Sequence, residues 1–308
     1  MPTPETFSYK DNLPSHIFKQ LPEKLKISGD KDPDILLIIR LLSGNVELTH
    51  NYTNKTIKSR VNYFTSDLST FRNWKTDFPA YFSEDTDAND LALFIDKNKR
   101  INIKFYAVIL AEVSQFILHT RRKSHTSAFI FIYRILEKIS FAFPLIYTSK
   151  TEDFIQSFTK LKKLMGNGDK KELAFFKSFI DMIYKGDSIS ETSVDFHFKI
   201  SDIDIRNQMF KEIKKITDDK AIHGDTDEPE KLSIKFCEMS SFIVNVRNRF
   251  FHNLNDGFSN FESNKIVDSD ELFSFINPMA IHWISMVLLE VVKFSLSEYQ
   301  KNLKALTE

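Results

Sequence analysis

The chain has 308 residues, which is enough for one large domain or two of ordinary size. Hydrophobic residues make up 42% of it and charged residues 27%, a globular composition that argues against wholesale disorder. The 42 Lys and Arg residues balance the 42 Asp and Glu residues, so no overall positive field attracts nucleic acid. Any nucleic-acid site must therefore be a local basic patch.

The low content of turn-forming residues indicates a mainly helical protein. With only 7 Gly and 9 Pro residues, long helices are favoured over many short strands. The 30 Phe residues predict a core built largely from Phe side chains.

The first hundred residues are predicted to form an N-terminal unit of unknown role, residues 1–100. In chain order, the patterns predict a polar arm over 1–33 with a short helix near 15–26, an apolar helix over 34–43, a small β-hairpin over 45–56, and a helix over 57–82. That last helix is inferred from five apolar residues three or four apart: Val61, Phe64, Leu68, Phe71 and Trp74. The acidic, turn-rich segment 83–90 is the expected boundary.

Residues 101–308 are predicted to form a helical bundle domain. The expected helices cover 103–119, 124–143 (stopped by Pro144), 152–165, 170–185, 206–217, 231–252 and 270–305 (with a possible break at Pro278). The alternation of Val194, Phe196 and Phe198 indicates one short strand before the helix at 206.

Cysteine usage and terminal sequence favour a cytoplasmic protein. A lone Cys237 excludes a disulfide framework and a cysteine-based zinc site. The N-terminus has no basic region followed by an apolar run, so no signal peptide is expected. The apolar stretches 104–118, 126–147 and 280–296 each carry charge near the middle, which favours core helices and no membrane contact. A membrane-associated effector using the last two stretches is a weaker alternative.

The segment from Arg247 to His252 carries the candidate catalytic pair. It follows an apolar helical stripe, and the turn residues after it place His252 in the last helical turn. A histidine can exchange protons with a ribose 2′-hydroxyl or a leaving oxygen near neutral pH. A guanidinium can hold the phosphate and offset its extra charge in the transition state. This pair therefore suits metal-independent cleavage of RNA.

One histidine cannot comfortably act as base and acid at once. Two copies of the chain, each giving an Arg and a His across a two-fold axis, would supply both groups. We therefore expect a homodimeric site. No metal site and no cofactor are expected, because the acidic loop around His223 offers no ligands at fixed spacing.

The Arg-x4-His pattern, with Asn248 directly after Arg247, resembles the HEPN superfamily. Its ribonuclease members carry an R-x4-6-H motif on a bundle of four or more helices. The resemblance covers at most residues 101–308 and implies catalytic roles for Arg247 and His252. It also implies an orienting or phosphate-binding role for Asn248, and a supporting glutamate at Glu137. As in that superfamily, the expected function is a metal-independent, dimeric endoribonuclease in a toxin or antiviral defence system, held by a regulatory or antitoxin partner.

Basic residues near the pair are the expected RNA contacts. These are Arg249, Lys211, Lys214 and Lys215. Two alternatives stay open. In the first, the helix end is purely structural, with Arg247 paired to Asp256 or Glu262 and His252 capping carbonyls. In the second, the chain is a non-catalytic helical module that binds RNA, a nucleotide or a protein.

Overall fold

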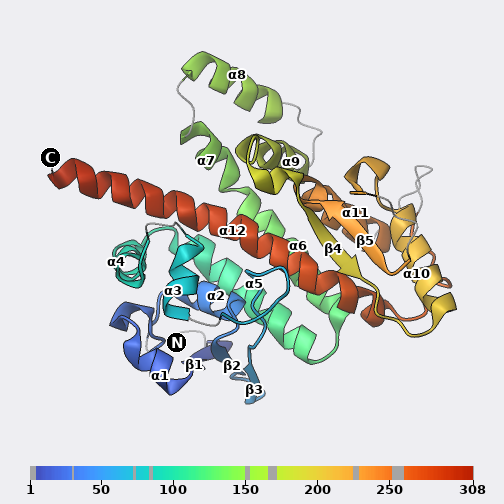
Figure 1. The fold of residues 1–308 in the computed structure, drawn as a ribbon, viewed down its shortest axis with the longest axis horizontal. Coiled ribbons are helices and arrows are strands. Elements are labelled where there is room, and N and C mark those ends of the chain that lie inside the picture. Colours follow the sequence, from blue (N-terminus) through green and yellow to red (C-terminus); the bar gives the residue numbers. More distant parts are fainter. Residues whose placement is uncertain are drawn as a thin grey trace. The chain divides into compact units, whose positions relative to one another are not determined.

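The computed structural model describes residues 5–29, 31–71, 74–82, 86–149, 153–165, 172–224, 229–251 and 260–307. This part of the chain is mainly helical, which confirms the expected fold class. Figure 1 shows the ribbon of the chain, which packs as two compact units. The first comprises residues 1–122 with 285–308, and the second comprises residues 123–284. The expected boundary at residue 100 thus falls inside the first unit.

The first unit contains a small antiparallel sheet. Its strands are β1 (Phe7–Asp11), β2 (Val46–His50) and β3 (Lys55–Lys58), in the order β1-β2-β3. The hairpin expected over 45–56 is confirmed as β2 and β3, with Leu48 opposite Ile57. Strand β1 was not expected, because residues 1–33 show only polar, Pro-punctuated sequence. It is defined by its partner, since Tyr9 pairs with Leu48 across the sheet.

The helices of the first unit form one compact unit with this sheet. They are α1 (Ser15–Gln20), the 3-10 turn η1 (Glu23–Leu25), α2 (Asp34–Leu42), α3 (Trp74–Ala80), α4 (Ala88–Asn98), α5 (Ile103–Arg121) and the second part of α12 (Ser269–Thr307). The helices expected over 34–43 and 103–119 are confirmed by α2 and α5. Asp87 caps α4 with a reciprocal capping box to Asp90, so this helix starts within the acidic segment 83–90.

The helix expected over residues 57–82 is wrong for most of its length. Among the described residues of this stretch only α3 is helical, and residues 59–71 form turns and irregular backbone. The Asn62 side chain accepts the Phe64 N–H at 3.1 Å, and the Thr65 hydroxyl bonds the Asn62 carbonyl. Such local side-chain bonds compete with helical hydrogen bonds. The apolar residues instead form an aromatic cluster, in which Phe64 lies against Phe78.

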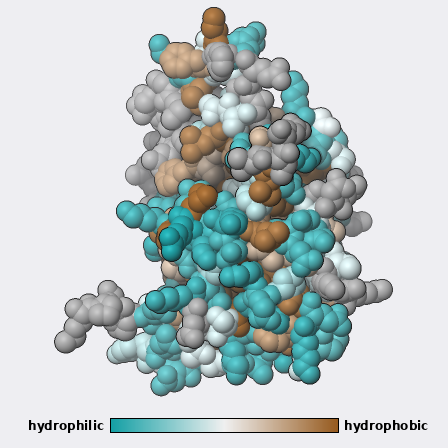
Figure 2. Space-filling model, turned by 90° about the vertical axis from the view of Figure 1, so that its left-hand side faces the viewer, coloured by the Kyte–Doolittle hydropathy of each residue, from teal (hydrophilic) through white to brown (hydrophobic). Residues whose placement is uncertain are grey.

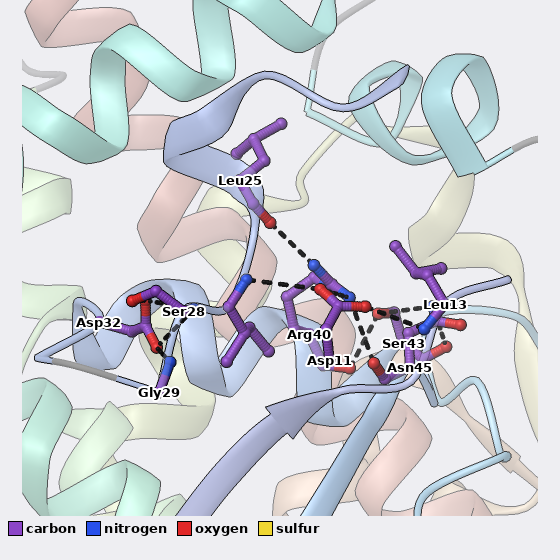
Figure 3. A network of polar contacts seen from close by, with 10 residues as sticks. Asp11, Leu13, Leu25, Ser28, Gly29, Asp32, Arg40, Ser43 and Asn45 are labelled. Carbon is purple, nitrogen blue, oxygen red and sulfur yellow. Dashed lines mark hydrogen bonds and ion pairs between the residues drawn. The ribbon is translucent and has the colours of Figure 1, made fainter. Parts of the chain in front are cut away.

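A buried arginine joins the segments of the first unit (Figure 3). Arg40 on α2 has no solvent exposure. Its guanidinium donates at 2.8 Å to the Asp11 carboxylate on β1 and at 2.8 Å to the Leu25 carbonyl of η1. It also donates at 3.2 Å to the Asn45 carbonyl and lies 4.9 Å from the Trp74 ring. Because no substrate can reach this group, we assign Arg40 a structural role.

The second unit combines helices with a two-stranded sheet. Its helices are α6 (His125–Ser140), α7 (Phe143–Ser149), α8 (Phe154–Met165), α9 (Glu172–Ile183), α10 (Ile203–Lys215), α11 (Met239–Phe251) and the first part of α12. Its strands are β4 (Ser193–His197) and β5 (Lys231–Lys235), and its 3-10 turns are η2 (Ser188–Glu191), η3 (Asp219–Ala221) and η4 (Phe236–Glu238). Pro144 does not stop α6 but lies in the first turn of α7, where proline is well tolerated. Helix α12 continues through Pro278.

The helix expected over residues 231–252 is wrong in its first part. Residues 231–235 form β5, which pairs antiparallel with the expected strand β4 and places Leu232 opposite Phe196. Both side chains are fully buried. Leu232 and Ile234 share one face of a strand, while Leu232 and Phe236 also have helical spacing. The spacing of the apolar residues therefore fits both a helix and a strand, and pairing with β4 selects the strand.

Aromatic side chains fill the core of the second unit, as expected from the Phe content. Phe129, Phe176 and Trp283 have no solvent exposure. The Trp283 indole N–H donates to the Phe236 carbonyl at 2.9 Å, so its one polar atom is satisfied. Other apolar residues lie at the surface, such as Ile155 (81% exposed) and Phe158 (67%) on α8. Figure 2 shows hydrophobic side chains at the top of the molecule, the height at which α8 lies in Figure 1.

Two helices in the described part of the chain are long and apolar enough to cross a membrane. These are α5 and most of α12, residues 269–305. In their most apolar windows, 50% and 72% of the residues are buried inside the structure. Core helices of soluble proteins pass the same test.

Candidate functional site at the end of helix α11

Helix α11 packs antiparallel against α6. The Phe251 ring stacks on the Phe129 ring, with centroids 6.4 Å apart and planes at 7°. Arg247 is one turn before Phe251 on α11, and Tyr133 is one turn after Phe129 on α6. The Arg247 guanidinium lies 4.9 Å from the centroid of the Tyr133 ring. The Phe129–Phe251 and Tyr133–Arg247 contacts define how the two helices are aligned. A step of four residues toward the end of α6 corresponds to a step of four residues toward the start of α11.

Two neighbours hold the Arg247 side chain. Its guanidinium donates to the Asn248 side-chain oxygen at 2.9 Å and covers the Tyr133 ring. Arg247 is half-buried, so the cation retains access to solvent. A guanidinium over an aromatic face is attracted by the ring quadrupole, which limits its rotation. His252, the expected catalytic partner, directly follows α11 in the sequence and lies outside the described residues.

The α6 residue opposite Arg247 is Tyr133, which the sequence did not single out. Glu137, the expected supporting glutamate, is half-buried one turn farther along α6. In the antiparallel register this turn lies beside residue 243, away from the end of α11. The signal for Tyr133 was present in the spacing of His125, Phe129 and Tyr133, which puts all three on one helical face.

A pocket of about 500 Å³ borders the last turn of α11. It is lined by Phe250, Phe261, Ser263, Ile266, Val267, Asp268 and Ser269. The Phe250 and Phe261 rings meet edge to face, with centroids 5.8 Å apart. The Phe261 N–H donates to the Arg249 carbonyl at 3.3 Å, which fixes this wall against the helix end. The volume is in the range of small-ligand sites.

The start of α12 closes one side of this pocket and binds the start of α6. The Asp268 carboxylate accepts the N–H groups of Asp270 and Glu271 at 2.8 and 3.2 Å, as an N-cap. The Thr126 N–H donates to the Asp270 carboxylate at 2.7 Å, and the Thr126 and Ser269 hydroxyls are 3.1 Å apart. Three helix ends therefore meet at this place: the last turn of α11 and the first turns of α6 and α12.

His125 lies at this junction. Its carbonyl accepts the Asn277 side-chain N–H at 2.8 Å. Its ring Nδ1 is buried without a hydrogen-bond partner. Burial lowers the pKa of His125, and Lys123 acts in the same direction, while the carboxylates of Asp270 and Asp268 partly offset this. The ring is therefore mainly neutral at pH 7.

The expected RNA-contact residues have different surroundings. Lys211 is exposed on α10, and Arg249 is half-buried in the last turn of α11. Lys214 lies 5.9 Å from the Phe210 ring centroid. Lys215 pairs with Glu262 at 2.8 Å. Glu262 therefore already balances the charge of Lys215, whereas Lys211 is exposed to solvent on α10.

Glu262 is one of the two residues that the structural alternative paired with Arg247. Hydrogen bonds from Lys215 and Lys265, at 2.8 and 2.9 Å, lower the pKa of Glu262 to about 2. These two lysines are its ion-pair partners in the described part of the chain. Asp256, the other expected partner, lies outside the described residues.

The described residues contain neither a cluster of metal-binding side chains nor a reactive cysteine. Within them, no group of three or more His, Cys, Asp or Glu side chains is arranged to hold a metal ion. Cys237 is half-buried in η4, and burial raises the pKa of its thiol to about 11. This thiol is protonated at neutral pH and is a poor nucleophile.

Comparisons with family models, with curated proteins and with solved structures found no match for this chain. The assignment of a function therefore depends on the geometry of this junction and on the residues of the Arg-x4-His segment.

Proposed function

We propose that the chain is a metal-independent endoribonuclease that uses Arg247 and His252. The observation that carries this proposal is the Arg247 guanidinium, held by Asn248 and Tyr133 one turn before the end of α11, beside an aromatic pocket of about 500 Å³. His252 is five residues after Arg247 in the sequence, and in this proposal it supplies an acid–base group next to the phosphate-binding cation.

In the proposed reaction, the RNA 2′-hydroxyl attacks the adjacent phosphorus. A base removes the hydroxyl proton, the new P–O2′ bond forms, and the P–O5′ bond breaks. An acid protonates the departing 5′-oxygen, leaving a 2′,3′-cyclic phosphate and a 5′-hydroxyl. The Arg247 guanidinium offsets the extra negative charge on the phosphate oxygens in the transition state. His252 serves as one of the two proton-transfer groups.

The second proton-transfer group must come from another copy of the chain or from elsewhere in the same chain. A homodimer that joins two Arg247–His252 pairs is the solution that the HEPN resemblance implies. A cytoplasmic toxin or defence effector, held by a regulatory partner, is the role that the same resemblance implies. Lys211 and Arg249 would supply local positive charge for the RNA backbone.

The test is cleavage of a labelled single-stranded RNA by the purified chain in EDTA. We expect products ending in 2′,3′-cyclic phosphate, and a loss of at least about 100-fold in Arg247→Ala and in His252→Ala. Arg134→Ala is the matched control, because Arg134 is exposed on α6 and its guanidinium lies over the Phe131 ring. Full activity in His252→Ala or dependence on a metal would contradict the proposal. RNA binding without cleavage would favour the non-catalytic module.

A further inference from the structure

We propose that the pocket beside the last turn of α11 selects a guanine base of the RNA, with Asp268 as the residue that determines specificity. This inference rests on the proposed ribonuclease function, because it names the nucleotide that the site would take. The residues that line the pocket all lie in the described part of the second unit.

Aromatic and aliphatic side chains form walls on which a flat base can stack. Phe250 and Phe261 meet edge to face, with ring centroids 5.8 Å apart. The Phe250 ring also packs on the buried Phe273 ring at 4.8 Å and 89°, which limits its rotation. Ile266 and Val267 add aliphatic surface. Proteins that recognise single-stranded RNA hold its unstacked bases on surfaces of this kind.

Helix α10 holds the segment that carries most of these side chains. The Gln208 side chain donates to the Lys265 carbonyl at 2.7 Å. The Lys215 ammonium donates to the Asn260 carbonyl at 3.2 Å and to the Glu262 carboxylate at 2.8 Å. The pocket is therefore preformed, so a base can bind without first ordering this segment.

At the start of α12, Asp268 and Ser269 present an acceptor beside a donor. Asp268 Oδ1 accepts the backbone N–H groups of Asp270 and Glu271, at 2.8 and 3.2 Å. Within the described residues its other oxygen, Oδ2, accepts no hydrogen bond and is available to a ligand. The Ser269 hydroxyl oxygen accepts from the Thr126 hydroxyl at 3.1 Å, so the Ser269 proton can be donated to a ligand.

Guanine matches this pair better than the other three bases. Its Watson–Crick edge carries an acceptor, O6, followed by two donors, N1–H and the N2 amino group. The Ser269 hydroxyl can donate to O6, and Asp268 Oδ2 can accept from N1–H and the amino group. Adenine and cytosine place a ring acceptor beside their amino donor, and uracil has a carbonyl on each side of its one donor. Each of these bases would turn a lone pair toward the carboxylate, which accepts hydrogen bonds only.

The pocket and the proposed phosphate-binding arginine share helix α11. Phe250 is three residues after Arg247, and side chains at this spacing are neighbours, with Cβ atoms roughly 5–6 Å apart. The base and the phosphate of one nucleotide can span such a separation. We therefore expect cleavage next to guanosine.

The first measurement is the affinity of the full chain for GMP, IMP, AMP and UMP by isothermal titration calorimetry, which does not depend on cleavage. GMP should bind most tightly, and IMP, which lacks the N2 amino group, should bind about 3–10-fold more weakly. Asp268→Asn should weaken GMP binding by about 10–100-fold, because an amide N–H group replaces the acceptor. The amide oxygen can still cap α12, so the fold is retained.

Two further variants test the two parts of the pocket separately. Asp202→Asn is the matched control for Asp268→Asn, because Asp202 caps α10 with the same pair of backbone bonds and does not line the pocket. It should leave the affinity for GMP unchanged. Phe261→Leu should weaken all four nucleotides by a similar factor of about 5–100, since stacking on a ring tolerates every base.

The second measurement maps the cleavage sites in a single-stranded RNA that contains all four bases. Wild type should cut next to guanosine, and Asp268→Asn should cut without this preference. Cleavage without base preference, together with equal affinity for the four nucleotides, overturns the guanine pocket and leaves the ribonuclease assignment in place. GMP binding that Asp268→Asn weakens, in a chain that cuts no RNA, supports the pocket and overturns the ribonuclease assignment. Unchanged GMP affinity in Asp268→Asn overturns the role of Asp268.

Discussion

Removing the negative charge at Asp11 should strongly destabilise the first unit. Arg40 is fully buried, and its partner Asp11 has a side-chain exposure of 10%. Burial lowers the pKa of Arg40, and the Asp11 carboxylate opposes this shift. Because a guanidinium stays protonated, the carboxylate is the counter-ion that offsets the burial of its charge. Asp11→Asn leaves this charge without a counter-ion at 2.8 Å. Breaking a buried ion pair in this way costs about 3–5 kcal/mol of unfolding free energy.

Substitution of the arginine should cost less. In Arg40→Met the buried charge disappears, and Asp11 still accepts the Leu13 N–H at 2.9 Å. The carbonyls of Leu25 and Asn45 lose a donor, which costs about 1–3 kcal/mol. In the double variant Asp11→Asn with Arg40→Met, no buried charge is left unpaired. Its cost should therefore fall below the sum of the two single costs by about 1–3 kcal/mol.

The two tryptophans allow this to be measured in one unit alone. Trp74 belongs to the first unit, 4.9 Å from the Arg40 guanidinium, and Trp283 belongs to the second. In a Trp283→Phe background, urea unfolding followed by fluorescence reports the surroundings of Trp74. The matched control is Asp96→Asn, because Asp96 pairs with Lys24 and Lys99 where solvent reaches all three side chains, and little change is expected there. A cost below about 1 kcal/mol for Asp11→Asn would refute the reasoning from burial.

Three further predictions concern the second unit. Tyr133→Leu removes the ring under Arg247 and should lower kcat/KM by about 3–30-fold, whereas Tyr133→Phe should leave it near wild type; equal losses in both would argue against the cation–π contact. Asn277→Leu leaves the His125 carbonyl without its side-chain donor and should lower the free energy of unfolding by about 1–2 kcal/mol. Urea titration measures this change, and an unchanged free energy would show that the bond is dispensable. Alkylation of Cys237 by iodoacetamide at pH 8 should be about 100-fold slower in the folded than in the unfolded chain, because burial raises the thiol pKa from 9.0 to about 11. Its rate should rise with pH up to about 11, and fast labelling at pH 8 would contradict that shift.

Local sequence determined most of the helices. The apolar spacing in residues 34–43 and 103–119 has no competing period, and α2 and α5 follow it closely. Helix α4 was not predicted, although the capping box between Asp87 and Asp90 that starts it is a local sequence signal. In these segments each residue's preference and the pattern of its neighbours agree, so little is left for tertiary contacts to decide.

Where the apolar spacing fits both a helix and another structure, contacts with distant parts of the chain decided the structure. Residues 231–235 could continue a helix or form a strand, and their partner β4, more than thirty residues earlier, makes them a strand. Residues 59–71 have helical spacing, but side chains such as Asn62 bond the local backbone and the apolar groups join an aromatic cluster. Such choices depend on contacts distant in sequence, which a local window does not contain.

The candidate site shows the same division. From sequence alone, Arg247, Asn248 and His252 could be read as a chemically sensible segment. The register of α6 against α11 was decided by packing, and it set Tyr133 under the guanidinium and Glu137 a turn away. Packing also joined the start of α6 to α12, where the His125 carbonyl accepts from Asn277 and the Thr126 N–H donates to Asp270. A motif names the residues of one segment, whereas only the folded chain shows which other residues meet it.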